Sequence, residues 1–201
     1  MNDCSQKHNV FVAFQKEMFD SNRFRHLLCA KLNKTVDGQE FCKQLQKHQC
    51  YLSGSVILEM LCDTKVAWQS DDIDIFFDDP ASQEDNPTPF EKYLINQGFL
   101  ITADTYDAYA FTWGIVYVRT YEKDNLKVQF IRSARDWTPQ TRVNSFDLSL
   151  CRNLFDGQNL YISYEADLQN CTFTVDPDFL QNEKTAQRIQ KYQKRGFTYK
   201  L

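Results

Sequence analysis

The first fifty residues have the apolar spacing of α-helices. Between residues 9 and 31, apolar side chains such as Phe11, Phe14 and Met18 recur at intervals of three and four, which is the spacing of residues that share one helix face. A similar pattern over residues 37–49 predicts a second helix. The sequence therefore predicts a helical N-terminal part.

The next segment combines short apolar strands with turns. CYLSGSVILEML (residues 50–61) predicts a strand, a Gly-Ser turn and a helix that starts near Ser55. DDIDIFF (residues 71–77) predicts a strand that carries two aspartates. An acidic loop with prolines follows, and residues 89–98 predict a helix that ends at a glycine.

After that glycine the pattern changes to period two. Runs rich in aromatic and β-branched residues predict strands at FLITAD (99–104), AYAFTWGIVYVRTYE (108–122) and NLKVQFIR (125–132), because side chains two positions apart share one face of a sheet. This part of the chain is therefore expected to form most of a β-sheet.

A hairpin and two helices complete the pattern. Residues 138–146 predict a short helix, and residues 147–162 predict a hairpin that turns at an Asp-Gly pair. Residues 177–195 predict a final helix that is rich in lysine and arginine.

These elements predict an α/β (α+β) fold with a mixed β-sheet flanked by helices. The length of 201 residues and the hydrophobic content of 42% suit one domain with a sizeable core. We expect a single domain over residues 1–201, with a helical N-terminal part (1–49), a sheet core that carries the motifs (50–175) and a C-terminal basic helix (176–201).

Charge and cysteine content exclude several classes of protein. The net charge of −4 argues against a general nucleic-acid coat protein. The sequence has no apolar run of transmembrane length and no signal peptide, so no membrane partner is expected. Seven scattered cysteines, an odd number, indicate reduced thiols and an intracellular, cytoplasmic location.

Charge is unevenly distributed along the chain. Residues 66–91 contain eight acidic and no basic residues, whereas residues 181–201 contain six basic residues and one acidic residue. The basic segment is either a solvated helix face or a surface that meets an anionic ligand.

Histidines and cysteines of the N-terminal part either bind zinc or pack as buried thiols on helices. Their spacing does not follow the paired pattern of structural zinc sites, which favours the second interpretation. The residues are His26, Cys29, Cys42, His48 and Cys50.

Two carboxylates in the DDIDIFF strand are the main candidates for chemistry. Asp72 and Asp74 are two positions apart and project to the same face of a strand. Paired carboxylates repel each other unless a cation or a proton lies between them, and oxygen ligands of this kind suit Mg²⁺. Two such ions about 3.5–4 Å apart can hold the oxygens of a phosphoryl transfer.

The Gly-Ser turn supports the same interpretation. Gly54 allows a backbone to approach a phosphate closely, and Ser55 can cap the following helix or bind a phosphate oxygen. The alternative is an ordinary turn followed by aspartates at a solvent-facing strand end. The order of the two motifs and their apolar surroundings favour a phosphate and metal site.

Gly-Ser, a helix and then DDIDIFF together resemble the signature of the nucleotidyltransferase superfamily, the group of DNA polymerase beta, poly(A) polymerases and CCA-adding enzymes. The resemblance implies a mixed sheet flanked by helices. It also implies that Gly54 and Ser55 hold a nucleoside triphosphate, and that Asp72 and Asp74 bind Mg²⁺ or Mn²⁺.

Three further segments are similar to poorly characterised nucleotidyltransferase-like proteins of large DNA viruses and fungi. This similarity covers roughly residues 50 to 197, and a viral origin would place the protein in an infected host cell. The segments are LKVQFIR (126–132), SFDLSLCRNLFDG (145–157) and TAQRIQKYQKRGF (185–197).

The sequence departs from the pattern of this superfamily at its third carboxylate. The equivalent position is Gln129, whose amide oxygen can bind a cation but supplies no negative charge. Asp147 is an alternative third acid. It lies among apolar residues and either joins the metal site or forms a cap or a salt bridge with Arg142 or Arg152.

The resemblance leaves two functions open. The first is an enzyme that binds a nucleoside triphosphate with Mg²⁺ and transfers a nucleoside monophosphate to a hydroxyl of a nucleic acid, a protein or a small molecule. Its catalytic residues would be Asp72, Asp74 and Asp147. The second is a catalytically inactive nucleotidyltransferase-fold module for binding or interaction, which Gln129 favours.

Overall fold

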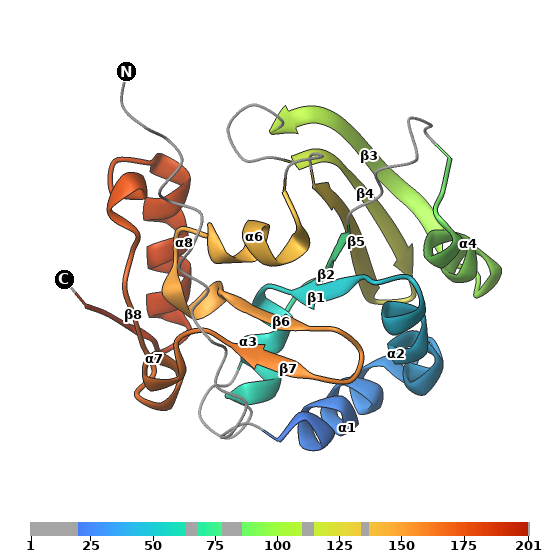
Figure 1. Cartoon of the computed structure of the whole chain (residues 1–201), viewed down its shortest axis with the longest axis horizontal. Helices are drawn as coiled ribbons and strands as arrows, with labels where there is room; N and C mark the ends of the chain where they lie inside the picture. Colours follow the sequence, from blue (N-terminus) through green and yellow to red (C-terminus); the bar gives the residue numbers. More distant parts are fainter. Residues whose placement is uncertain (1–19, 63–67, 78–85, 110–114, 134–136, 201) are drawn as a thin grey trace.

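The computed structural model describes residues 20–62, 68–77, 86–109, 115–133 and 137–200. Within these residues a seven-stranded mixed sheet in the order β3-β4-β5-β2-β1-β6-β7 forms the centre of the molecule (Figure 1). Neighbouring strands are antiparallel except β2 and β5, which are parallel. The predicted α/β fold with a mixed sheet flanked by helices is confirmed.

The seven strands lie in the regions that the sequence predicted. They are β1 (Tyr51–Ser53), β2 (Ile73–Phe77), β3 (Leu100–Tyr109), β4 (Ile115–Lys123), β5 (Leu126–Ser133), β6 (Asn153–Phe155) and β7 (Leu160–Ile162). The strand predicted over 108–122 is wrong in its bounds, because its first two residues belong to β3 and β4 begins at Ile115. The β6–β7 hairpin turns at Asp156 and Gly157 as predicted. The Asp156 carboxylate accepts hydrogen bonds from the backbone N–H groups of Gln158 and Asn159, and Gly157 has a φ of 94°.

Seven α-helices pack around this sheet in the described residues. They are α1 (Ser21–Leu32), α2 (Gly38–Lys47), α3 (Ser55–Leu61), α4 (Pro89–Asn96), α6 (Pro139–Asn144), α7 (Glu165–Gln169) and α8 (Glu183–Lys194). No helix in this part of the chain is both long enough and apolar enough to cross a bilayer.

The predicted N-terminal helices are present where the structure describes the chain. Asp37 caps α2 by accepting hydrogen bonds from Gln39 and Glu40, so the helix begins close to the predicted position. Asp20 caps α1 in the same way. The first part of the helix predicted over residues 9–31 lies outside the described residues.

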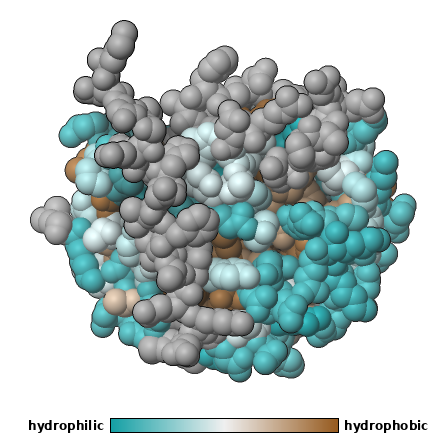
Figure 2. Space-filling model, viewed as in Figure 1, coloured by the Kyte–Doolittle hydropathy of each residue, from teal (hydrophilic) through white to brown (hydrophobic). Residues whose placement is uncertain are grey.

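The hydrophobic core lies where the N-terminal helices, α3 and α4 meet the sheet. The ring of Phe130 on β5 lies 5.2 Å from that of Phe90 on α4 and 5.6 Å from that of Tyr121 on β4, both edge to face. Hydrophilic side chains cover the α1–α2 side of the molecule (Figure 2). This arrangement gives β2 and β5, which carry the candidate motifs, a rigid apolar support.

A buried carboxylate fixes α4 to the outer strands. Glu91 on α4 is fully buried and accepts hydrogen bonds from Tyr121 at 3.0 Å and from Arg119 at 3.5 Å. Arg119 also pairs with Asp104 on β3 at 2.8 Å. Because a buried charge is costly without partners, these contacts hold α4, β3 and β4 in one arrangement.

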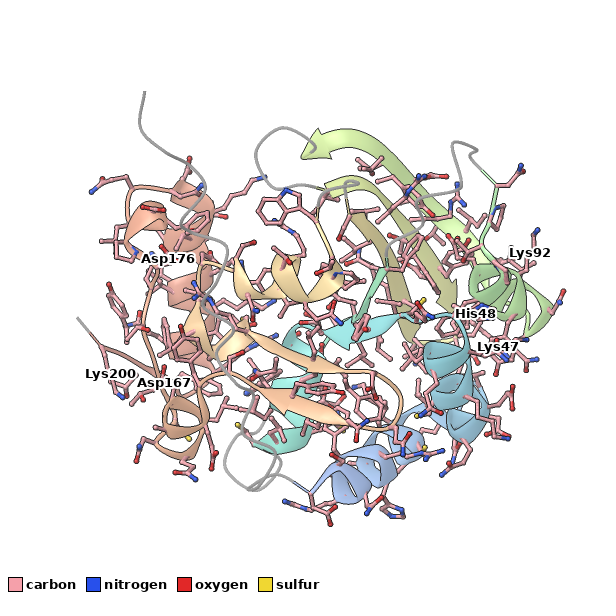
Figure 3. All side chains as sticks on the ribbon, viewed as in Figure 1. Lys47, His48, Lys92, Asp167, Asp176 and Lys200 are labelled. Carbon is pink, nitrogen blue, oxygen red and sulfur yellow. The ribbon has the colours of Figure 1, made fainter. Side chains whose placement is uncertain are left out.

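The C-terminal region differs in part from the prediction. α8 begins at Glu183 rather than at residue 177, because Asn182 caps it and residues Pro177–Phe179 form a 3-10 turn. Two short strands that the sequence did not indicate, β8 (Thr172–Phe173) and β9 (Thr198–Tyr199), pair in parallel. Beside them Lys200 forms an ion pair with Asp167 on α7 at 3.1 Å (Figure 3). The single-domain organisation over residues 1–201 stays a prediction.

Candidate cation and phosphate site

The acidic pair lies at the centre of the sheet. Asp74 is on β2, between β1 and β5, and Asp72 lies directly before this strand. Ile73 and Ile75, which alternate with the aspartates, are fully buried in the core. Burial of the isoleucines turns both carboxylates to the opposite face, so the predicted pairing of Asp72 and Asp74 on one face agrees with the structure.

Gly54 lies against the carboxylate of Asp74. Ser53, which precedes it, is opposite Asp74 in the β1–β2 register. Gly54 has a φ of 83°, and a Cβ at this position would lie 2.4 Å from Asp74 Oδ2. The turn therefore requires glycine for two reasons, its backbone conformation and the space that the carboxylate occupies.

Ser55 holds the segment that enters β2. Its hydroxyl is 2.7 Å from the hydroxyl of Ser70, which donates in turn to the backbone oxygen of Asp72 at 2.8 Å. The backbone N–H of Ser70 donates to Glu59 on α3 at 2.7 Å. Ser70 was not among the predicted site residues, because no motif marks it and two of its partners, Ser55 and Glu59, lie 15 and 11 positions earlier in the sequence.

A row of polar side chains crosses four neighbouring strands at the level of Asp74. The strand registers place Thr120 of β4 beside Gln129 of β5, Gln129 beside Asp74 of β2, and Asp74 beside Ser53 of β1. Ser53 is fully buried and donates to the backbone oxygen of Asn153 at 2.7 Å. Thr120 and Ser53 are site residues that sequence analysis missed.

Gln129 lies next to both carboxylates. With its amide nitrogen turned to the pair, this group is 3.3 Å from Asp72 Oδ2 and 3.2 Å from Asp74 Oδ1. The structure thus brings together Gly54, Asp72, Asp74 and Gln129, and it places an amide where the superfamily pattern has a third carboxylate.

Burial and the neighbouring carboxylate change the proton affinity of Asp74. Burial, and then the negative charge of Asp72, raise the pKa of Asp74 to about 7. The positive charges of Arg188, Lys191 and Lys127 act in the opposite direction. A carboxyl with this pKa exchanges its proton readily for a cation near neutral pH.

Asp74→Asn is expected to stabilise the metal-free protein at pH 8 but not at pH 4. The folded-state pKa lies above the ordinary value of 3.8, so the contribution of Asp74 to stability is full below about pH 4 and is lost as the pH rises past about 7. The gain at pH 8 should be on the order of 2 kcal/mol. Urea unfolding of both proteins in EDTA measures it.

The exposed neighbour Asp71 provides the matched control. Asp71→Asn should leave the free energy of unfolding unchanged within about 0.5 kcal/mol at both pH values. Equal stabilisation by Asp74→Asn at pH 4 and pH 8 would show that charge burial at Asp74 is not the cause.

Asp147 has a different set of partners from the predicted one. Its side chain is 1% exposed and forms an ion pair with Arg188 on α8 and a hydrogen bond with Thr185 at 2.8 Å. Of the two partners considered from the sequence, Arg152 pairs with Asp176 at 2.9 Å instead. The negative charge of Asp147 acts on Arg142 and opposes the lowering of the pKa of Arg142 by burial. Asp147 therefore ties α8 to the sheet region.

The basic face of α8 is less solvated than the sequence suggested. Arg188 contacts Asp147 and lies 3.6 Å from the Cys151 sulfur. Arg195 lies over the ring of Trp68, 4.0 Å from its centroid. Lys191 stays exposed, and Lys127 at the start of β5 is half-buried. Positive charge therefore faces the acidic pair from α8 and from β5.

The residues around the acidic pair fit one divalent cation. Two carboxylates and an amide oxygen are the hard oxygen ligands that Mg²⁺ and Mn²⁺ accept. Gly54 leaves room for the Asp74 carboxylate, which a side chain at this position would displace. Within the described ranges, no three side chains of histidine, cysteine, aspartate or glutamate meet as a metal site. Asp147 thus does not complete a group of three carboxylates.

The cysteines and histidines considered for zinc do not form such a group either in the part of the chain that the structure describes. Cys29, Cys42 and Cys50 are buried. Burial raises the pKa of Cys42 and that of Cys50 to about 12, so both thiols are protonated near neutral pH in the metal-free protein.

The fold and the site define an α/β protein with an acidic pair at the centre of a mixed sheet, and solved structures share this fold. A tRNA-processing enzyme in its apo form matches with a TM-score of 0.57 and 14% identity, over 85% of this chain and 44% of that chain. A complex of a tRNA-processing enzyme matches with a TM-score of 0.55 and 15% identity, over 79% and 43%. The chain thus spans less than half the length of either.

The chain belongs to the Gabija anti-defense 2 (Gad2) family, whose model matches residues 7–188. No curated protein matched the sequence. The family match overturns the identification as a nucleotidyltransferase-like protein of large DNA viruses and fungi, and with it the nucleoside monophosphate transfer and the inactive nucleotidyltransferase-fold module predicted from that resemblance.

The structure gives a physical reason why the resemblance was a weak guide. The Gly-Ser and Asp-x-Asp motifs are short, and part of each has a local role: Gly54 accommodates Asp74, and Ser55 binds Ser70. Gln129 and Asp147 depart from the expected set of three carboxylates.

Proposed function

We propose that this protein counteracts Gabija defence, with Gabija proteins as its partners, in the cytoplasm of the host cell. The observation that carries this proposal is the family match, which extends over residues 7–188 and so includes the acidic pair, the polar row and the first half of α8.

We further propose that the acidic pair binds Mg²⁺ or Mn²⁺ together with the phosphates of a nucleoside triphosphate. Asp72 and Asp74 provide two negative charges for the cation, and Mg²⁺ in proteins commonly keeps waters and binds phosphate oxygens beside one or two carboxylates. The positive charges of Lys191 and Lys127 are close enough to act on Asp74. A ligand that carries both a cation and phosphates satisfies both halves of the site.

Each residue has a separate task in this arrangement. Gly54 leaves room for the Asp74 carboxylate, and the Ser55–Ser70 contact fixes the backbone of Asp72. Arg188 is held by Asp147, which sets the position of α8 and of the exposed Lys191 one turn further on. The ligand would thus bind between the centre of the sheet and α8.

A protection assay in cells that carry Gabija defence tests the function. The chain should restore growth of a virus that this defence blocks. The viral growth restored by the double variant Asp72→Asn/Asp74→Asn should be at least tenfold lower, because asparagine keeps the shape of aspartate but removes both negative charges.

Asp71→Asn is the matched control, because this exposed aspartate belongs to the same segment. It should protect the virus as well as the unchanged chain does. Failure of the unchanged chain to restore viral growth would contradict the anti-defence function. Full protection by the double variant at equal expression would contradict the role of the acidic pair.

A further inference from the structure

The amide of Gln129 can face the acidic pair with either end. With the nitrogen toward the pair it donates to Asp72 and Asp74, and its oxygen accepts from the Thr120 hydroxyl at 3.3 Å. With the oxygen toward the pair, its nitrogen donates to the same hydroxyl at 3.3 Å. Because a hydroxyl both donates and accepts, Thr120 supports both orientations with one hydrogen bond.

The two orientations suit opposite states of the site. Without a cation, an amide oxygen beside two carboxylates would place three acceptors together, whereas the nitrogen supplies two donors. With a cation bound, N–H groups would point at a positive ion, whereas the oxygen is a ligand for it. Occupancy by a cation therefore decides which end of Gln129 faces Asp72 and Asp74.

The charge of the ligands also limits how many cations the site holds. Asp72 and Asp74 carry two negative charges, which balance one divalent ion. Gln129 adds an oxygen but no charge, and the nearby Arg188, Lys191 and Lys127 oppose further positive charge. A second ion about 3.5–4 Å away, as in two-metal sites, would lack charge compensation from these residues.

We infer that Gln129 is a reversible ligand, which bridges the two aspartates through its amide nitrogen when the site is empty and turns its oxygen to the ion when one divalent cation binds. This inference rests on the proposed cation site. Gln129, supported by Thr120, then determines how many cations bind and how tightly.

Calorimetric titration with Mg²⁺ and Mn²⁺ compares the unchanged chain with two variants. The unchanged chain should bind one ion. Gln129→Leu, which removes the amide, should weaken binding about tenfold, and Gln129→Glu, which adds a third carboxylate, should tighten it about tenfold. In the ¹⁵N-labelled unchanged chain, the side-chain amide signal of Gln129 is identified as the one that both variants lack. Saturating Mg²⁺ should shift this signal.

The outcomes separate this inference from the site on which it rests. Unchanged affinity in Gln129→Leu, an unmoved Gln129 amide signal at saturating Mg²⁺, or two Mn²⁺ ions per unchanged chain would each overturn the role of Gln129 while the cation site stands. Absence of binding by the unchanged chain and by Gln129→Glu alike would overturn the cation site itself.

Discussion

Arg188→Met is expected to destabilise the protein by about 3–5 kcal/mol, because it leaves a buried carboxylate without its charge partner. The side chain of Asp147 is 1% exposed, whereas that of Arg188 is 36% exposed. Methionine keeps much of the apolar stem of arginine but not the guanidinium, whose carbon lies 6.0 Å from the centroid of the Phe146 ring, so a weak cation–π contact is lost together with the ion pair. Urea unfolding at pH 7 measures the change.

A second substitution isolates the charge effect. In the Arg188→Met background, Asp147→Asn removes the uncompensated charge but keeps a group that can bond to Thr185. The double variant should therefore be more stable than Arg188→Met alone by at least about 1 kcal/mol. If the double variant is less stable than Arg188→Met, the ion pair does not explain the loss.

Gly54→Ala is expected to lower the free energy of unfolding by about 3 kcal/mol and to weaken binding of Mg²⁺ at least tenfold. The φ of 83° is strained for alanine, and the new Cβ would collide with Asp74 Oδ2 at 2.4 Å. Either the turn or the carboxylate must move, and both changes disturb the acidic pair. Urea unfolding and calorimetric titration with Mg²⁺ measure the two effects.

Gly98→Ala provides a control for backbone strain. Gly98 also has a positive φ, 86°, but the nearest atom to a Cβ there is Lys123 Cε at 3.9 Å. Gly98→Ala should therefore destabilise the protein without changing its affinity for Mg²⁺. Equal effects of both substitutions on binding would show that the contact between Gly54 and Asp74 does not matter to the site.

The strands and the acidic pair could be predicted because they depend on local patterns. β2 alternates aspartates with buried isoleucines, and β5 alternates Gln129 with Val128 and Phe130, both fully buried. This alternation places the polar side chains of a strand on one face, and it does not depend on contacts with distant parts of the chain. The position of Gln129 beside the pair did not follow from this alternation: the superfamily resemblance suggested it, and the parallel pairing of β2 with β5 shows it.

The partners of buried charges could not be predicted, because they depend on contacts between distant segments. Arg188 is 41 positions away from Asp147, and no periodicity joins them. Ser70 and Ser55 are 15 positions apart, and the contact depends on how the segment before β2 returns to α3. Family membership was also out of reach, since short motifs recur in unrelated chains.

Titration with MgATP, MgGTP, MgCTP and MgUTP tests the central claim, that Asp72 and Asp74 form a site for a divalent cation and a nucleoside triphosphate. At least one triphosphate should bind in a way that requires Mg²⁺ or Mn²⁺, and this binding should disappear in Asp72→Ala/Asp74→Ala and persist in Asp71→Asn. Binding of no triphosphate by the folded chain, or equal binding by the double variant, would contradict it.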